Sequence, residues 1–255
     1  FRDVCIRSSP APGGGVTVLQ ALKILEGYPL QHLGHNSPEY LHLLVSALKA
    51  AFADRSASVG DPAFVDVPQA RLLSDAHAMA WREAIDAGRL PTAAAQPTPG
   101  TTHLTVADDE GNVVSLTHTL GGGSGVVTPG LGFQYNNGAN QFDPLPGRPN
   151  SLAPGKARLS GMAPTLVFRG GRPLLALGSP GSNAIISAVL QVILNVVEFG
   201  MTPLEAVSAP RIHCEGAEVI CETRIPETVR TALERRGHTG LSLTPRARPD
   251  RLSAS

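Results

Sequence analysis

The chain has 255 residues, of which 42% are hydrophobic, 16% charged and 4% aromatic, with 27 glycines and 22 prolines. This composition is typical of a compact, loop-rich globular protein and excludes a disordered chain. Lysine plus arginine and aspartate plus glutamate each count 21. The sequence therefore lacks the basic excess of a nucleic-acid-binding protein, and we expect no nucleic-acid partner.

The first hundred residues predict three helices and a loop. Apolar residues recur at helical spacing over residues 16–27, behind three glycines. A second helix is expected after Ser37, a good N-cap, with Pro38 in its first position. A third helix covers residues 74–87. Residues 88–100 are rich in proline, alanine and threonine and lack periodicity, which predicts an exposed, flexible loop.

Strands dominate after residue 100. They are expected at residues 103–107, 113–120, 165–170 and 173–178, followed by a buried helix at 183–199 and short helices near 203–209 and 226–236. The longest apolar run, residues 184–197, is shorter than the ~20 residues that a membrane span needs. We therefore expect no membrane span in this segment, and helices layered on a sheet.

The cysteines and the first residues set no compartment. Cys5, Cys214 and Cys221 form no C-x-x-C pair, and the spacing of His213, Cys214 and Cys221 fits no zinc pattern. We expect neither a disulfide framework nor a metal, and no cofactor motif is present. The chain opens without an initiator methionine, so we expect it to start in mid-fold, with any signal peptide outside this sequence.

The segment "TTHLTVADDEGNVVSLTHTL" predicts a β-hairpin. A three-residue loop at 109–111, with Gly111 in the left-handed position, is a favoured connection. In that register paired residues sum to 220, and a shift by one residue would set hydroxyl side chains against apolar ones. The expected cross-strand pairs are Leu104 with Leu116, Val106 with Val114, and Thr101 with Thr119.

The Thr101–Thr119 pair has a chemical use. A threonine hydroxyl is a weak nucleophile until a base removes its proton. If the chain were cut between Gly100 and Thr101, the freed α-amino group, with a pKa of ~8, would be such a base. Thr119 would hold the rotamer of Thr101. Taken alone, however, "TTH" is also typical of an ordinary strand, because threonine is common in strands.

A second feature is the Gly-rich turn in "PLLALGSPGSNAIISAVL". Backbone N–H groups of Gly181 and Ser182 would be free at a helix N-terminus, where they suit an oxyanion or a phosphate. The turn matches neither common nucleotide-binding pattern. An ordinary strand-to-helix turn remains the alternative.

These pieces together resemble the γ-glutamyltranspeptidase family of N-terminal nucleophile hydrolases. The resemblance runs from about residue 10 to 226 and includes "PAPGGGVTVLQALKILE", "FADRSASVGDPAFVDVP", "TTHLTVADDEGNVVSLTHTL", "MAPTLVF", "GSPGS" and "VLQVILNVVEFGMTPLEAVSAPRIH". It implies an α+β fold, the αββα four-layer sandwich. It also implies a precursor that cuts itself at Gly100–Thr101. Residues 1–100 would then end the large subunit and residues 101–255 form the small one, the two making a heterodimer.

The resemblance also assigns roles. Thr101 is the nucleophile, Thr119 its hydrogen-bonding partner, and the N–H groups of Gly181 and Ser182 form the oxyanion hole. The family's G-S-P-G-G carries Ser182 at its last place, which we expect to be harmless for a backbone donor.

The substrate-binding residues depart from the family pattern. Gly121 replaces an asparagine, and Asn140 and Gln141 replace the aspartate pair, so the carboxylate that holds the substrate's α-ammonium becomes neutral Gln141. The serine pair that holds the α-carboxylate reads Ser160-Gly161. Asp143 is a second carboxylate nearby that would replace the lost one if it reached the site.

Three interpretations follow. The first is a γ-glutamyl transferase or hydrolase that passes the acyl group of an amide such as glutathione to water or an amine. The second is an acylase of the same fold for a non-glutamyl amide, with a neutral pocket. The third is an inactive binding relative, which the retained Thr101 and Thr119 disfavour.

Overall fold

The computed structural model describes residues 1–91, 101–244 and 253–254. The helical segments are α1 (Gly15–Leu25), η1 (Leu30–Leu33), α2 (Pro38–Ser58), α3 (Gln69–Leu72), α4 (Asp75–Asp86), η2 (Gly138–Gln141), α5 (Ala184–Val197), α6 (Pro203–Ser208) and α7 (Glu227–Arg235). The strands are β1 (Val4–Ser8), β2 (Thr101–Ala107), β3 (Val113–Thr119), β4 (Thr165–Arg169), β5 (Arg172–Gly178), β6 (Ile212–His213), β7 (Val219–Glu222), β8 (Leu241–Thr244) and β9 (Ser253–Ala254).

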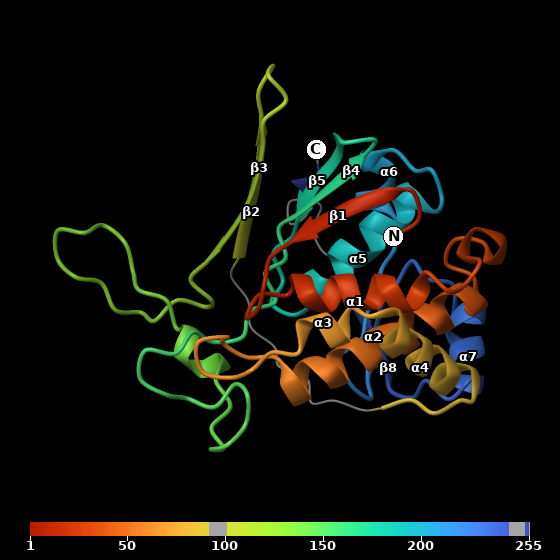
Figure 1. The fold of residues 1–255 in the computed structure, drawn as a ribbon, viewed down its shortest axis with the longest axis horizontal. Helices are drawn as coiled ribbons and strands as arrows, with labels where there is room; N and C mark the ends of the chain where they lie inside the picture. The colour runs from red at the N-terminus through yellow and green to blue at the C-terminus, as the bar shows by residue number, and fades with distance from the viewer. Residues whose placement is uncertain (92–100, 245–252, 255) are drawn as a thin grey trace.

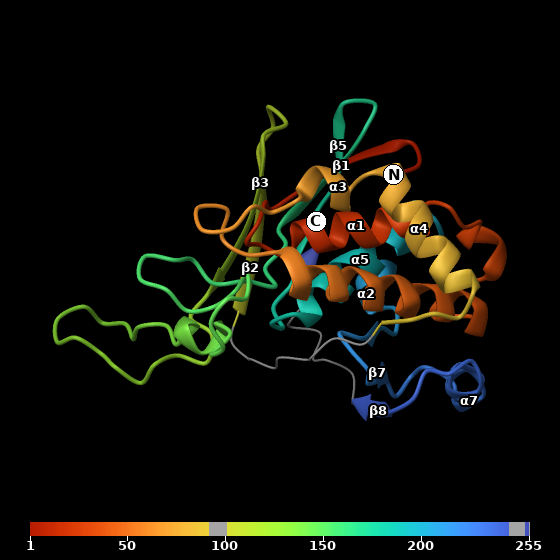
Figure 2. The same ribbon diagram turned by 60° about the horizontal axis from the view of Figure 1, so that its bottom comes forward.

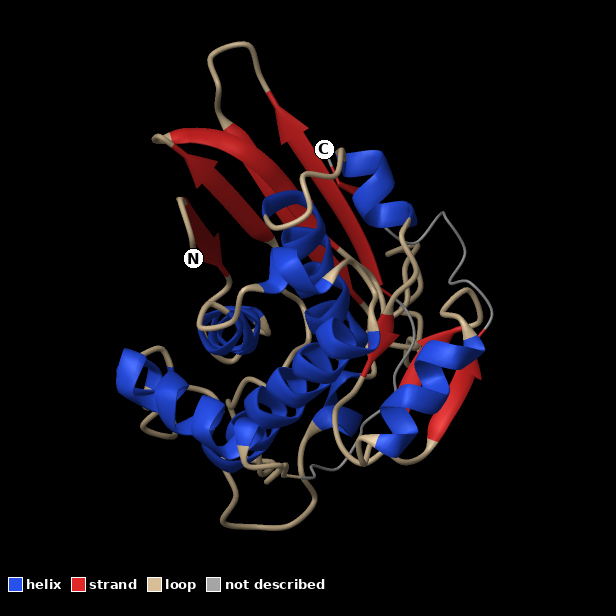
Figure 3. Ribbon diagram, turned by 90° about the vertical axis from the view of Figure 1, so that its right-hand side faces the viewer, coloured by secondary structure: helices blue, strands red, loops and turns tan. Residues whose placement is uncertain are grey.

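A four-stranded antiparallel sheet, ordered β1-β4-β5-β9, forms the centre of the fold. Helices α1 and α5 lie along one face of it, and α2 packs against α1 (Figures 1 and 3). Their apolar faces join the inward side chains of β4 and β5 in one buried core that includes Leu22, Leu44, Leu48, Val167, Leu177, Ile186 and Leu190. Burying this apolar surface is the main force that holds helices and sheet together.

The β2–β3 hairpin stands on the other side of the sheet (Figure 1). All seven of its cross-strand pairs sum to 220, from Thr101 with Thr119 to Ala107 with Val113, so the predicted register is confirmed. The described residues thus supply helices, a sheet and a hairpin of the αββα arrangement, and the α+β class is confirmed.

Pairing of apolar side chains across the hairpin suggests that their face packs against the sheet, but the structure shows the opposite orientation. The apolar face of the hairpin points outward within the described residues, where Leu104, Val106, Val114 and Leu116 are 44% to 58% exposed. The hydroxyl-bearing face lies against the sheet, and the Ser115 hydroxyl donates to the Leu177 carbonyl at 3.1 Å. This face is compatible with packing because its polar side chains hydrogen-bond one another and the backbone.

Side-chain caps mark the starts of three helices, α2, α4 and α6. The Ser37 side chain accepts from the backbone N–H of Tyr40 at 3.1 Å, as the sequence predicts for α2, and the Ser74 side chain accepts from the N–H of His77 at 3.2 Å at the start of α4. Thr202 and Glu205 make a complete capping box at α6. The predicted loop at residues 88–100 falls largely on residues 92–100, which lie outside the described residues.

A second, small sheet lies at one end of the molecule. It has the order β6-β7-β8 and sits with α7 away from the long loops that follow the hairpin (Figure 2). β6 and β7 are antiparallel, whereas β7 and β8 are parallel. In the part of the chain that the structure describes, no helix combines the length and apolar character needed to cross a membrane.

Candidate active site

Thr101 and Thr119 meet at the open end of the hairpin. The Thr101 hydroxyl donates to the Thr119 hydroxyl oxygen at 3.1 Å, within the predicted hydrogen-bond reach. Thr119 Oγ1 also accepts from the Gly121 N–H at 2.9 Å. With this second bond the hydroxyl of Thr119 is fixed by the backbone, so it can in turn hold one rotamer of Thr101.

His103 anchors the hairpin and does not contact the Thr101 hydroxyl. Its ring nitrogens pair with the hydroxyls of Thr117 and Thr105 at 2.9 and 3.2 Å, and burial lowers the pKa of the imidazole. The ring lies against Gly178 of β5, where an added Cβ would be 2.3 Å from Nδ1. His103 is therefore a neutral side chain that seats β2 on the central sheet.

The Gly-rich turn leads from β5 into α5, as the sequence predicts. Gly181 has a φ of +129° and Ser182 a φ of +56°. Among the described residues, neither of their backbone N–H groups donates a hydrogen bond. A left-handed serine costs roughly 1–2 kcal/mol, because its Cβ crowds the backbone. The change to Ser182 is thus not harmless for the backbone, although it keeps the N–H donor.

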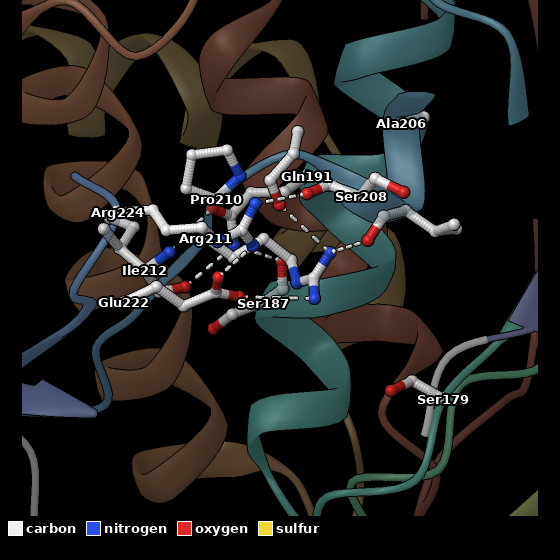
Figure 4. Close-up of polar contacts among 12 residues, drawn as sticks. Ser179, Ser187, Gln191, Ala206, Ser208, Pro210, Arg211, Ile212, Glu222 and Arg224 are labelled. Atoms are coloured by element: carbon white, nitrogen blue, oxygen red, sulfur yellow. Dashed lines mark hydrogen bonds and ion pairs between the residues drawn. The ribbon is translucent and has the colours of Figure 1, made fainter. Parts of the chain in front are cut away.

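Helix α5 is held by polar contacts to β6, and Arg211, just before β6, is tied to α6 and β7 (Figure 4). The Gln191 side chain donates to the Ile212 carbonyl at 2.8 Å and accepts from its N–H at 3.0 Å. Arg211 donates to the Val207 carbonyl at 2.6 Å and pairs with Glu222 at 3.3 Å. Because α5 starts just after the turn, the contacts of Gln191 with β6 also help to position the turn.

Cys214, Cys221 and His213 are engaged in packing, whereas Cys5 is exposed. The His213 imidazole pairs with Ser187 at 2.8 Å and with Glu215 at 3.0 Å. Burial raises the pKa of the Cys214 thiol to about 12 and that of Cys221 to about 11. No group of three or more metal-binding side chains gathers anywhere in residues 1–91 and 101–244.

A small cavity of about 10 Å³, room for roughly one water molecule, lies beside the two threonines. Its lining residues are Thr101, Thr119, Gly121, Gln141, Arg158, Ser160, Gly161, Met162, Ser182 and Ile185. Six of the eight predicted site residues therefore meet here. Gly181, the neighbour of Ser182, faces a separate cavity, and Asn140 is exposed and lies outside.

The cavity is not neutral, as the acylase interpretation expected, but basic. Arg158 donates through Nη1 to the side-chain oxygen of Gln141 and, at 2.9 Å, to the Leu159 carbonyl. Asp143 does not replace the missing carboxylate. It accepts from the Leu145 N–H at 2.9 Å and pairs with Arg148 at 3.0 Å, contacts that lower the pKa of its carboxyl, and it does not line the cavity.

Comparison with known proteins decides the family. The family described as Gamma-glutamyltranspeptidase matches residues 1–249. The chain belongs to the γ-glutamyltranspeptidase family. The acylase ACY 1 proenzyme of Pseudomonas sp. (strain V22) is 46% identical over 93% of this chain, and the glutathione hydrolase proenzyme of Escherichia coli (strain K12) is 36% identical over 84%. The chain spans 44% and 40% of those two proteins, less than half of each.

Solved structures agree with this assignment. A crystal structure of cephalosporin acylase from Bacillus halodurans matches 98% of this chain and 46% of its own, with a TM-score of 0.85 at 29% identity. A γ-glutamyltranspeptidase inhibited by acivicin matches 56% of this chain and 84% of its own, with a TM-score of 0.54 at 38% identity. The N-terminal nucleophile hydrolase fold is thus confirmed.

Two departures from the γ-glutamyltranspeptidase pattern have steric causes. At Gly121, with a φ of +64°, an added Cβ would lie 2.1 Å from Oδ1 of Asn137. At Gly161, an added Cβ would lie 2.1 Å from the carbonyl oxygen of Ser182. Neither position accepts the family's side chain unless the neighbouring backbone or Asn137 moves.

A buried arginine without a predicted role, Arg55, supports the cavity from behind. Arg55 is 4% exposed, and its guanidinium donates to the carbonyls of Ser160 at 2.8 Å and Gly13 at 3.4 Å. Burial lowers the pKa of Arg55 to about 10, which leaves it cationic at neutral pH. The Ser160 hydroxyl itself accepts from the Met162 N–H at 3.2 Å. The motif "FADRSASVGDP", which is part of the family resemblance, contains Arg55 and is the sequence feature from which a role for this residue could have been predicted.

Proposed function

We propose that this chain is part of a self-processing amidohydrolase whose nucleophile is Thr101. The observation that carries the proposal is the 3.1 Å hydrogen bond from Thr101 to Thr119, in a cavity that Ser182 also lines. A hydroxyl held in one rotamer, in a cavity lined by a residue with an unpaired backbone N–H, is the arrangement that acyl transfer needs.

The proposed reaction uses a base that maturation creates. Hydrolysis of the Gly100–Thr101 peptide bond releases the α-amino group of Thr101, which then takes the proton of the Thr101 hydroxyl. The oxygen attacks the substrate's amide carbon, and the N–H groups of Gly181 and Ser182 receive the developing oxyanion. The resulting ammonium protonates the leaving amine as the C–N bond breaks. Water or another amine then attacks the ester and restores Thr101.

This proposal divides the chain into two parts. Residues 1–100 belong to the end of a large subunit, and residues 101–255 form a small subunit that begins at the nucleophile. The division is supported by the proenzyme relatives and by the pairing of β1, before the cut, with β4, after it. Both fragments would stay in one heterodimer, because the sheet spans them.

For the substrate, we infer an amide whose acyl part carries no ammonium group. Neutral Gln141 stands where the family has an aspartate, and no carboxylate is among the described residues that line the cavity. The acylase relative, at 46% identity, favours the same conclusion. A γ-glutamyl donor such as glutathione is the second candidate, favoured by the glutathione hydrolase relatives.

Two measurements on the full-length precursor test the proposal. Intact-mass analysis should find a fragment that begins at Thr101, and a Thr101→Ala variant should give neither fragment nor turnover. Thr101→Ser, which keeps a hydroxyl, should retain part of both. Glutaryl and γ-glutamyl anilides then rank the two substrate candidates. A precursor that stays whole and inert toward every anilide would instead point to an inactive binding relative.

A further inference from the structure

Arg158 is the one cation among the described residues that line the Thr101 cavity. Its guanidinium is half-buried, and burial lowers the pKa of the group. In residues 1–91 and 101–244, no carboxylate lies within ion-pair distance of it. A half-buried charge without a counter-ion is unfavourable. Binding of an anionic ligand beside Arg158 would therefore stabilise this arrangement.

The surrounding backbone is shaped around this side chain. Gly138 lies under the guanidinium, and an added Cβ there would be 2.7 Å from Nε and 3.3 Å from Cδ of Arg158. The following residue, Leu159, is held through its N–H by Asn150 at 2.9 Å, and its carbonyl accepts from Arg158 Nη1 at 2.9 Å. The guanidinium is thus aimed into the cavity by fixed backbone, with a neutral amide, Gln141, as its side-chain partner.

We propose that Arg158 determines acyl specificity by binding a carboxylate at the far end of the substrate's acyl group. The inference rests on the proposed role of Thr101, which lines the same cavity. A guanidinium fork matches a carboxylate with two parallel hydrogen bonds. The same positive charge repels an α-ammonium group, so the substrate class is a half-amide of a dicarboxylic acid, such as a glutaryl amide.

Binding requires Arg158 to move. The cavity has room for roughly one water molecule, less than an acyl chain needs. A carboxylate is a stronger acceptor for a guanidinium than the amide oxygen of Gln141. An incoming acyl carboxylate therefore draws the side chain off Gln141 and opens the space that the arginine now fills.

The experiment measures kcat/KM of the full-length, self-cleaved enzyme on two anilides of equal length. One carries a glutaryl group, and the other carries its neutral primary amide in place of the distal carboxylate. The unmodified enzyme should prefer the glutaryl compound. Arg158→Met should lower kcat/KM on the glutaryl compound by about 10- to 100-fold, the scale of a lost charge-assisted hydrogen bond, and change it little on the neutral one.

Two further variants sharpen the test. Arg158→Lys keeps the charge without the fork and should retain an intermediate preference. Arg172→Met removes an exposed arginine of β5 outside the cavity and should leave the preference unchanged. Intact mass shows whether each variant still cuts itself and is therefore folded.

The outcomes separate the two proposals. If the unmodified enzyme cleaves both anilides equally, or Arg158→Met keeps the glutaryl preference, the role of Arg158 is wrong while that of Thr101 stands. Equal cleavage of the two anilides is measured on the unmodified enzyme alone, so the proposal can be refuted even if the Arg158→Met protein does not fold. If the unmodified enzyme cuts itself but cleaves no anilide, the proposed function fails first.

Discussion

Gly161 and Ser182 pack backbone against backbone, so that a Cβ on Gly161 would lie 2.1 Å from the Ser182 carbonyl oxygen and 2.9 Å from Cα of Asn183. Gly161 belongs to the loop before β4, and Ser182 to the turn before α5. The contact therefore joins the loop proposed to bind the substrate to the proposed oxyanion donors. A side chain at 161 has to displace the turn.

Gly161→Ala is accordingly expected to lower kcat by roughly 10-fold or more, because displacing an oxyanion donor should cost part of the roughly 10²- to 10³-fold loss that follows removal of one. Gly161→Ser should do the same, although it restores the family's hydroxyl, because both variants add the same Cβ. Kinetics on the glutaryl anilide measures the effect. A gain of activity in Gly161→Ser alone would contradict the steric argument.

Ser182→Gly should stabilise the protein. Glycine relieves the strain of a φ of +56° but is more flexible when unfolded, so the net gain is about 1 kcal/mol or less. Urea unfolding of the matched pair measures it, and Ser124→Gly, on an exposed loop, is the control. If the free energy of unfolding of Ser182→Gly is equal to or lower than that of the unmodified protein, contacts of the serine side chain must compensate for the strain of its backbone.

Thr119→Val should lower kcat by about 10-fold or more, because the isosteric change removes the acceptor that orients the Thr101 hydroxyl. Thr119→Ser keeps the hydroxyl and should lose much less. Steady-state kinetics, after checking cleavage by mass, compares them. A Thr119→Val enzyme with unchanged kcat would show that the hydroxyl of Thr119 does not orient Thr101.

Gln141→Asp should shift the ratio of kcat/KM toward a γ-glutamyl anilide by about 1–3 kcal/mol, the worth of one charge-assisted hydrogen bond. The shift should be smaller with Arg158 present, because the new carboxylate pairs with the guanidinium that now contacts Gln141. Measuring Gln141→Asp in both the unmodified and the Arg158→Met background separates the two effects. Equal shifts in the two backgrounds would show that residues 141 and 158 do not interact.

Acid should destabilise the fold through His238. This fully buried imidazole lies 2.7 Å from His42, and burial, with His42, Lys49 and Arg236 nearby, lowers the pKa of His238 to about 3. The unfolded chain binds the proton near pH 6.5 and the folded chain does not. The free energy of unfolding should therefore fall by up to about 1.4 kcal/mol per pH unit between pH 6.5 and 3.

Urea unfolding at pH 7.5, 6 and 5 measures this slope. His238→Leu should flatten it, whatever its effect on absolute stability, whereas His32→Leu, at an exposed position, should leave it unchanged. A slope that persists in His238→Leu would assign the acid sensitivity to other groups.

The sequence predicts those parts of the fold that are set by neighbours along the chain. The loop ending in Gly111 determines the register that places Thr119 opposite Thr101, and Ser37 and Ser74 mark helix starts. The two-residue alternation of the hairpin defines two faces but not which one meets the sheet. That choice depends on Gly178, whose lack of a side chain leaves space for His103.

Features made by distant segments escaped prediction. The side-chain partner of Arg158 is Gln141, which comes close to it only when a long loop folds. Arg55 donates to the carbonyl of Ser160, which is 105 residues away in the sequence. Strand β1, with alternating exposed positions, and the strands β6 to β8, of two to four residues, carry too little pattern to be recognised.

The seat of His103 on Gly178 ties the proposed nucleophile and the proposed oxyanion donors to the same short stretch of chain. Gly178 ends β5 only three residues before Gly181, while His103 lies two residues after Thr101. Because Gly178 has no side chain, the hairpin packs close to the central sheet at this point. A larger residue at 178 would push the hairpin away from the turn. The distance between the Thr101 hydroxyl and the N–H groups of Gly181 and Ser182, which are proposed to act on the same substrate carbonyl, would then increase.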